Sequence, residues 1–266
     1  MAQCVIVVPC YNEASRLNTA EFRNYLARAP HVSMLFVNDG SSDDTLAVLQ
    51  RMQAALPEQV EVLDMAKNSG KGEAVRLGLL QALERKDAVY AGFWDADLAT
   101  PLSAIDDLLN VCLAEPNVEM VLASRVKLLG REIERLAVRH YLGRVFATCA
   151  SLVLSIPVYD TQCGAKLFRV TPKLPEMLQK PFCSRWIFDV ELIARFLQLH
   201  GPDRQKARGL IYEFPLFRWT DVPGSKVRPR DFFIAMAELW TIWRTYPPPK
   251  PTAKADSAMA AETPKP

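Results

Sequence analysis

The chain has 266 residues, of which 50% are hydrophobic and 23% are charged, which suits a compact globular protein and excludes wholesale disorder. Its 32 basic and 30 acidic side chains give a formal net charge of +2, so no global field indicates nucleic acid as a partner. The six cysteines show no CxxC pair and no histidine at metal-ligand spacing, which argues against a zinc site or a disulfide scaffold.

The N-terminus enters an apolar run within three residues and has none of the features of a signal peptide, so we expect a reduced, cytoplasmic protein. No apolar run reaches the roughly 18 residues that a membrane span requires. The longest, residues 145–158, predicts either a buried helix or a helix at the membrane surface, and both interpretations stay open.

Short apolar runs alternate with longer helical patterns through residues 1–125. Residues 43–55 and 71–84 carry apolar side chains at helical spacing between such runs. The expected strands begin at Cys4, Ser33, Val60, Val89 and Glu119. This alternation is typical of βαβ units, and it predicts an α/β fold around a mainly parallel sheet flanked by helices.

After residue 125 the pattern changes to a long helical stretch over residues 134–154 and, later, a strand over residues 210–217. We expect a single domain over residues 1–246, whose second half, 126–246, is an addition on the substrate side. Residues 247–266 are rich in proline and alanine with little to bury, which predicts a disordered tail.

Polar residues follow three of the predicted strands. They are PCYNE at 9–13, NDGSSDD at 38–44 and DAD at 95–97. Ligands of open α/β sheets bind outside the carboxyl ends of the strands, so these segments are expected to form the site.

Asp95 and Asp97 flank one small residue directly after a buried strand. Two carboxylates so placed can hold Mg²⁺ or Mn²⁺ while leaving positions for diphosphate oxygens. An isolated pair of this kind is usually a solvated turn, but its place at the strand end favours the metal site. The cation would offset the charge that develops on a departing nucleoside diphosphate.

Two further segments have alternative interpretations that the residues alone leave open. Asp39 either caps the following helix or accepts hydrogen bonds from a base or ribose. The two glycines around Lys71, just before a helix, indicate either a phosphate contact or a plain loop-to-helix turn.

These motifs, in this order and at these intervals, resemble glycosyltransferase family 2. Four later segments look like the dolichyl-phosphate glucosyltransferase branch of that family. They are ASR at 123–125, DTQCGAKLFR at 160–169, RWIFDVEL at 185–192 and PGSKVRPRD at 223–231. The resemblance implies a GT-A fold, with a nucleotide-sugar half over residues 1–125 and an acceptor half over residues 126–246.

The resemblance also implies an inverting, metal-dependent transferase that moves a hexose, with glucose expected, from a UDP-sugar to a polyprenyl phosphate. Asp95 and Asp97 would bind the metal, either Mg²⁺ or Mn²⁺. The residues expected to bind the nucleotide sugar are Pro9, Tyr11, Glu13, Asp39, Lys71, Asp95 and Asp97. Related mannosyltransferases use GDP-mannose and have a Gln where this chain has Ala99, which leaves the rest of the metal shell open.

An anionic acceptor needs cations that fix its phosphate oxygens, and we select Arg125, Arg139 and Lys226 for this role. A phosphate acceptor is already ionised and needs no strong base, whereas a sugar hydroxyl does. Asp160 and Asp189 are the candidate bases, and helix capping or a hydrogen bond at the edge of the core is the alternative for each.

Several other functions stay open. The acceptor is soluble in one alternative, because the resemblance implies a membrane anchor that we do not expect in this chain. A sugar nucleotidyltransferase and a non-catalytic scaffold that binds nucleotide sugars are the others. If the acceptor is a lipid, residues 145–158 with Trp240 and Trp243 would give a peripheral contact at the cytoplasmic face of a membrane.

Overall fold

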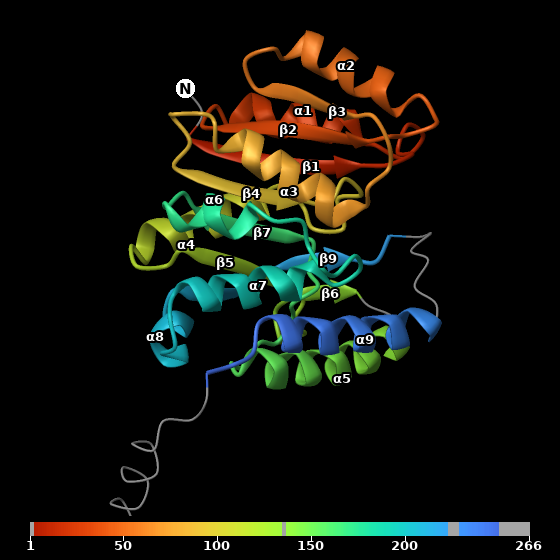
Figure 1. Ribbon diagram of the computed structural model, residues 1–266. Helices are drawn as coiled ribbons and strands as arrows, with labels where there is room; N and C mark the ends of the chain where they lie inside the picture. Colours follow the sequence, from red (N-terminus) through yellow and green to blue (C-terminus); the bar gives the residue numbers. More distant parts are fainter. Residues whose placement is uncertain (1–2, 135–136, 223–228, 250–266) are drawn as a thin grey trace, which may run out of the picture.

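The computed structural model describes residues 3–134, 137–222 and 229–249. A seven-stranded sheet with the order β3-β2-β1-β4-β7-β5-β8 runs through the centre of the molecule (Figure 1). Its strands are β1 (Cys4–Cys10), β2 (Val32–Asp39), β3 (Val60–Met65), β4 (Tyr90–Trp94), β5 (Met120–Ser124), β7 (Ala165–Arg169) and β8 (Ile211–Pro215). A small parallel sheet pairs β6 (Glu132–Glu134) with β9 (Arg218–Thr220).

The predicted mainly parallel α/β sheet is confirmed, with one strand that sequence patterns did not predict. Strand β7 lies between β4 and β5 and runs antiparallel to both. The remaining pairs of the large sheet are parallel. The carboxyl ends of β1, β2 and β4 therefore share one edge of the sheet, on the right in Figure 1.

Helices cover both faces of the sheet because alternate residues of each strand point to opposite sides. Ile6 and Val8 of β1 belong to a core with α1, α2 and α4, whereas Val5 and Val7 belong to a core with α3, α5, α6, α7 and α9. The helices are α1 (Thr19–Arg28), α2 (Thr45–Ala55), α3 (Lys71–Ala82), α4 (Ala104–Ala114), α5 (Ala137–Leu154), α6 (Lys173–Leu178), α7 (Phe188–Leu199), α8 (Arg204–Arg208) and α9 (Pro229–Thr245).

Helices α5 and α9 lie side by side at the end of the molecule below the sheet (Figure 1). The α5 helix contains most of the apolar stretch for which sequence patterns left a buried helix and a helix at the membrane surface open. One side of it is buried and the other is exposed, and contact with a membrane stays a prediction. Phe146 and Ala150 pack into the core, but Leu152 is 74% exposed and Val145 is 53% exposed. Within the residues that the structure describes, no helix is long and apolar enough to cross a membrane.

Helix α3 packs unusually close to the sheet, which fixes the position of its N-terminal residue Lys71. A Cβ atom built on Gly78 would lie 2.4 Å from Val7 Cγ1 and 2.8 Å from Val37 Cγ2. Only a residue without a side chain fits there. The helix is therefore held directly against β1 and β2.

We expect Gly78→Ala to destabilise the protein by about 1–3 kcal/mol, because the added methyl group forces α3 away from the sheet. Urea unfolding followed by circular dichroism measures the change. The matched control is Gln50→Ala, an exposed change within α2, which should stay within about 0.5 kcal/mol of the wild type. Equal stabilities of the two variants would show that α3 can move without cost.

Candidate functional site

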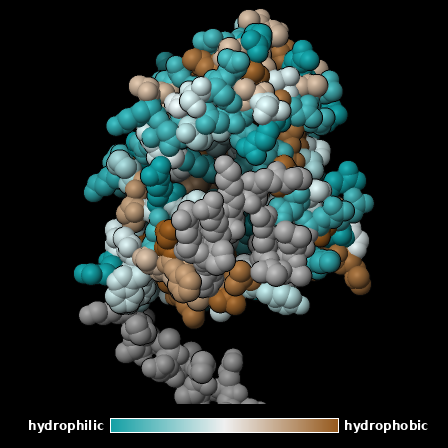
Figure 2. Space-filling view, turned by 90° about the vertical axis from the view of Figure 1, so that its right-hand side faces the viewer, coloured by the Kyte–Doolittle hydropathy of each residue, from teal (hydrophilic) through white to brown (hydrophobic). Residues whose placement is uncertain are grey.

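The polar segments after β1, β2 and β4 meet at one edge of the sheet, as predicted. Cys10 at the end of β1 is in register with Asn38, one residue before the end of β2. Strand β4 pairs with the other side of β1 and is followed directly by Asp95. Figure 2 views the molecule from this side, and hydrophilic residues dominate its upper part.

Hydrogen bonds hold the loop after β1 against the loop after β2. The amide of Asn12 donates to Ser41 Oγ at 3.0 Å, and the Asn12 side chain accepts from the amide of Ser42 at 2.9 Å. The amide of Glu13 donates to Thr45 Oγ1 at 2.8 Å. These contacts give the PCYNE segment a fixed shape before any ligand binds.

Within that segment, Glu13 and Tyr11 offer groups to a ligand. Glu13 Oε1 pairs with Arg16 at 2.5 Å, whereas its Oε2 is buried without a hydrogen-bond partner in the described part of the chain. Burial raises the pKa of Glu13, an effect that Arg16 opposes. The Tyr11 side chain is 47% exposed, and Pro9 lies one residue before the end of β1.

Asp39 shapes the loop before α3 and does not cap α2. Its carboxylate accepts from Asn68 Nδ2 at 3.0 Å and from the amides of Ser69 at 2.7 Å and Gly70 at 2.9 Å. Asp43 instead accepts from the amide at the start of α2. A carboxylate has about four lone-pair sites, so these three bonds leave room for about one more. Contact with a nucleoside remains a prediction.

Lys71 and Asp95 form an ion pair at the centre of this edge, with 2.5 Å between Lys71 Nζ and Asp95 Oδ1. Burial alone would lower the pKa of Lys71, but the carboxylates of Asp95, Asp189 and Asp97 outweigh it and raise that pKa. The lysine therefore stays charged at neutral pH and can meet a phosphate group.

Asp97 is exposed, and its Oδ1 accepts from the Ala99 amide at 3.1 Å. Desolvation and the charge of Asp95 nevertheless raise the pKa of Asp97. The Asp95 carboxylate thus disfavours the charge of Asp97. A bound cation would relieve this repulsion.

Gly164 brings a distant segment against Asp95 and is a residue that sequence patterns did not select. Its carbonyl accepts from the Asp95 amide at 2.9 Å, and a Cβ atom built on it would lie 1.9 Å from Asp95 Oδ2. Any side chain here would displace the carboxylate. The only signal in the sequence is a glycine directly before an apolar β-rich run.

The two aspartates fit a cation that is shared with a substrate, not one enclosed by the protein. No cluster of three or more metal-ligating side chains exists among the described residues. Mg²⁺ commonly binds through one or two carboxylates plus substrate phosphates and water, so Asp95 and Asp97 suffice. The Lys71 ammonium already pairs with Asp95, so this carboxylate has one positive partner before any cation binds.

The candidate acceptor residue Arg125 and the candidate base Asp160 bind each other. Arg125 Nε lies 2.6 Å from Asp160 Oδ2, and its Nη2 lies 2.8 Å from Oδ1. Both side chains are nearly buried, and the guanidinium carbon lies 5.2 Å from the Trp219 ring centroid. Although burial opposes its charge, Asp160 raises the pKa of Arg125. This bidentate pair leaves neither group free in the structure.

The second candidate base, Asp189, is also paired. Its Oδ1 lies 2.5 Å from Lys166 Nζ, and that ammonium donates in addition to the Cys163 carbonyl at 2.7 Å. Both side chains are buried. Lys166 was not selected from the sequence, since nothing in its surroundings distinguishes it from a surface lysine.

Two of the predicted acceptor ligands cannot be placed. Lys226 and the side chain of Arg139 lie outside the described residues. Most of the tail predicted over residues 247–266 also lies outside the described residues, which end at residue 249.

Residues 5–171, which span β1 to β7, match the profile described as "Glycosyl transferase family 2". The chain belongs to glycosyl transferase family 2. The matched residues include Glu13, Asp39, Lys71, Asp95 and Asp97.

Several relatives of this family 2 chain are dolichyl-phosphate beta-glucosyltransferases. The chain is 32% identical to the dolichyl-phosphate beta-glucosyltransferase of Drosophila melanogaster, over 91% of this chain and 74% of that one. It is 33% identical to the Homo sapiens protein of the same name, over 91% of this chain and 78% of that one.

Solved structures confirm the GT-A fold. The glucosyl-3-phosphoglycerate synthase of M. tuberculosis superposes with a TM-score of 0.61 at 15% identity, over 94% of this chain and 82% of that one. The mannosyl-3-phosphoglycerate synthase of Rubrobacter xylanophilus superposes with a TM-score of 0.63 at 17% identity, over 92% of this chain and 74% of that one. A further structure of the mycobacterial enzyme contains Mn²⁺ and UDP-glucose. It superposes with a TM-score of 0.61 at 16% identity, over 94% of this chain and 80% of that one.

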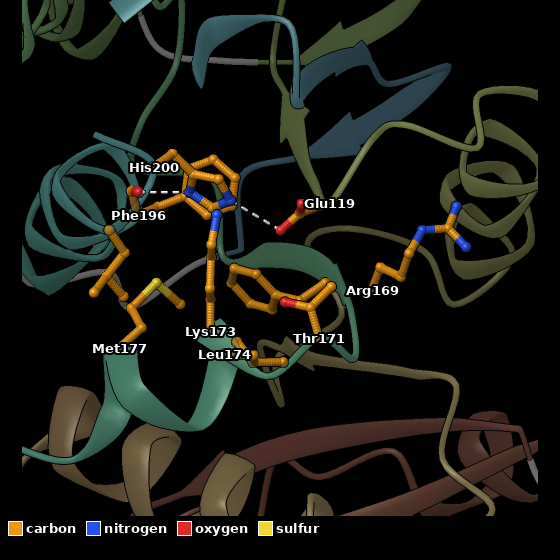
Figure 3. A pocket seen from close by; sticks show the side chains of 10 residues that line it. Glu119, Arg169, Thr171, Lys173, Leu174, Met177, Phe196 and His200 are labelled. Atoms are coloured by element: carbon orange, nitrogen blue, oxygen red, sulfur yellow. Dashed lines mark hydrogen bonds and ion pairs between the residues drawn. The ribbon is translucent and has the colours of Figure 1, made fainter. Parts of the chain in front are cut away.

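A small pocket lies at the opposite edge of the sheet of this family 2 chain (Figure 3). Glu119, directly before β5, and Arg169, at the end of the antiparallel strand β7, contribute to its wall. His200 Nε2 lies 3.0 Å from Glu119 Oε2 and joins the end of α7 to this wall. The pocket is separated from Asp95 by the length of the strands, so it is not part of the candidate site.

We expect Asp97→Asn to raise the melting temperature of the metal-free protein by about 1–3 °C near pH 7, because it removes a charge that partial desolvation and the charge of Asp95 disfavour. The raised pKa means that the folded state binds the proton more tightly than the unfolded state. The gain should therefore shrink as the pH falls through the folded-state pKa of Asp97 and the wild-type carboxylate becomes neutral.

Thermal unfolding across this pH range measures the difference. Glu58→Gln, at an exposed carboxylate before β3, is the matched control and should change little at any pH. If the two variants behave alike, Asp97 does not experience the repulsion described here.

Proposed function

We propose that this chain transfers glucose from UDP-glucose to a polyprenyl phosphate, with inversion at the anomeric carbon and with a divalent metal. The observation that carries the proposal is the pair Asp95 and Asp97 beside Lys71 at the end of β4, in a chain whose relatives are dolichyl-phosphate beta-glucosyltransferases. Similar solved structures contain UDP-glucose and Mn²⁺, which supports the donor and the metal.

The donor would bind across the edge of the sheet. Tyr11, with Pro9 behind it, would contact the base, and Glu13 and Asp39 would accept hydrogen bonds from the nucleoside. The unpartnered Glu13 Oε2 supports this role because a buried oxygen without a donor is costly. Asp95 and Asp97 would hold Mg²⁺ or Mn²⁺, which neutralises charge on the departing diphosphate. Lys71 would contact the same diphosphate.

The pairing of the candidate bases supports a phosphate acceptor over a sugar hydroxyl. Asp160 is engaged by Arg125 and Asp189 by Lys166, so neither carboxylate is ready to take a proton. An acceptor phosphate is already ionised. One of its oxygens would attack the anomeric carbon, the bond from that carbon to the UDP oxygen would break on the opposite side, and UDP would leave with the electron pair. No proton transfer is required.

We expect the purified protein to form polyprenyl-phosphate glucose from UDP-glucose with Mg²⁺ or Mn²⁺ and to lose this activity with EDTA. Asp97→Ala should lower kcat by about 100-fold or more, because the developing charge loses its counter-ion. Glu58→Gln is again the matched control. Product formation is followed by chromatography of the radiolabelled lipid.

The same assay separates the rival functions. Transfer from GDP-mannose in place of UDP-glucose would overturn the donor assignment, and transfer only to a soluble sugar or acid would overturn the acceptor assignment. Pyrophosphate release from UTP and a sugar phosphate would identify a nucleotidyltransferase. Tight UDP-glucose binding without any turnover would identify a scaffold.

The lipid acceptor would be reached through α5 and α9, by a peripheral position at the cytoplasmic face of a membrane. Both helices expose large apolar side chains, among them Leu152 of α5 and Trp240, which is 60% exposed and stacks on Trp243. In Figure 2 hydrophobic residues gather along the lower edge of the site face, the side on which α5 and α9 lie in Figure 1. Tryptophan at such an edge is typical of contact with lipid head groups.

We expect the wild type to co-sediment with vesicles that contain polyprenyl phosphate. The double variant Leu152→Glu, Trp240→Glu should bind these vesicles at least about tenfold more weakly, since two apolar anchors are lost. Leu113→Glu, at a leucine of α4 that is 67% exposed on the other face of the sheet, is the matched control. The membrane proposal fails if vesicles without the phosphate head group bind the protein equally well, or if the control weakens binding as much.

A further inference from the structure

The loop over residues 183–187, between α6 and α7, is held by two carboxylates from different helices. Glu191 of α7 accepts from the amides of Cys183 and Ser184 at 3.1 and 2.9 Å. Glu238 of α9 accepts from the amides of residues 185, 186 and 187 at 3.1, 3.0 and 3.0 Å. Five consecutive backbone N–H groups therefore have carboxylate acceptors, which fixes the path of this loop.

The side chain that this loop presents to the site is Arg185. A Cβ atom built on Gly70 would lie 3.3 Å from Arg185 Nε and 3.9 Å from its Nη2. Gly70 has φ +95°, its amide binds Asp39, and the next residue is Lys71. Arg185 is thus next to the loop that opens α3, at the residue before Lys71 of the Lys71–Asp95 ion pair.

The guanidinium of Arg185 is unoccupied, unlike those of Arg125 and Arg195. It is exposed and forms no hydrogen bond or ion pair with another described residue. Arg125 is bound by Asp160, whereas Arg195 is bound by Glu191 and by backbone carbonyls. A free, exposed guanidinium on a loop with a fixed path is suited to bind two oxygens of an anionic group such as a phosphate.

The charge balance of the edge favours such a ligand. Asp95, Asp97 and Glu13 would repel a phosphate group, and Lys71 is already engaged by Asp95. The first amides of α3, a helix of 12 residues, add positive potential at the same place. Arg185 adds a positive charge that forms no ion pair with a carboxylate of the described residues.

We propose that Arg185 binds a phosphate group of a substrate and that Glu238 places it there. The source of that phosphate, the donor diphosphate or the acceptor phosphate, rests on the function proposed above, whereas phosphate binding itself does not. Because Glu238 lies on α9 with Trp240 and Trp243, the helix that would meet the lipid also holds the phosphate-binding loop.

The test compares Arg185→Gln and Arg185→Lys for ligands with and without phosphate. UDP and uridine, each with Mn²⁺, are titrated by calorimetry, and vesicles with polyprenyl phosphate are compared with vesicles containing the corresponding alcohol. We expect Arg185→Gln to weaken one of the phosphate ligands about tenfold or more and Arg185→Lys to restore part of the loss. Uridine and alcohol vesicles should bind as to the wild type.

The ligand that weakens identifies the source of the phosphate. Loss for UDP assigns Arg185 to the donor, and loss for the polyprenyl-phosphate vesicles assigns it to the acceptor. If neither ligand weakens, or if uridine weakens as much as UDP, the proposal is wrong. Arg23→Gln, which removes an exposed arginine of α1 on the other face of the sheet, is the control for net charge.

Glu238→Ala tests the positioning role. It should weaken the same phosphate ligand several-fold, whereas Glu238→Gln, which keeps an acceptor oxygen, should recover part of the affinity. Equal affinity of Glu238→Ala and the wild type would exclude Glu238 as a positioning residue. Arg185-dependent UDP binding in a protein that transfers no sugar would leave this inference standing and overturn only the proposed function.

Discussion

The ion pair between Lys71 and Asp95 depends on packing between segments from both halves of the chain, and the rest of the site is arranged around it. Lys71 opens α3, which Gly78 holds against β1 and β2, and the loop before it is bound by Asp39. Asp95 is set by the end of β4 and by the close approach of Gly164. A positive group is therefore present beside the carboxylates before a substrate binds, and little rearrangement is needed when one does.

Much of this edge could be predicted because parallel strands bring their carboxyl ends to the same side. The apolar runs located β1 to β5, and the polar residues behind them included Glu13, Asp39 and Asp95. Strand β7 could not be predicted in this way. Periodicity identifies an apolar run as a strand but does not say which strands it pairs with or in which direction.

Charged residues show the same limit more clearly. Asp160 and Arg125 were each selected for contact with a substrate, and they bind each other across 35 positions of the chain. Asp189 likewise meets Lys166 in the interior. Sequence patterns identify an ionisable group, whereas its availability depends on neighbours that only the fold brings close. Arg185 is the opposite case, since the sequence marked it only as the first residue of the segment 185–192 and gave it no role, and yet its guanidinium forms no hydrogen bond or ion pair with another described residue.

The antiparallel strand β7 has a consequence for how the protein folds. In a chain that stopped at residue 125, β5 would have no partner strand, because both of its neighbours, β7 and β8, come later. Strand β4 would keep only β1, with its other edge open to aggregation. During synthesis the sheet thus stays incomplete until β7 and β8 have left the ribosome. The two parts of the chain therefore complete one sheet together.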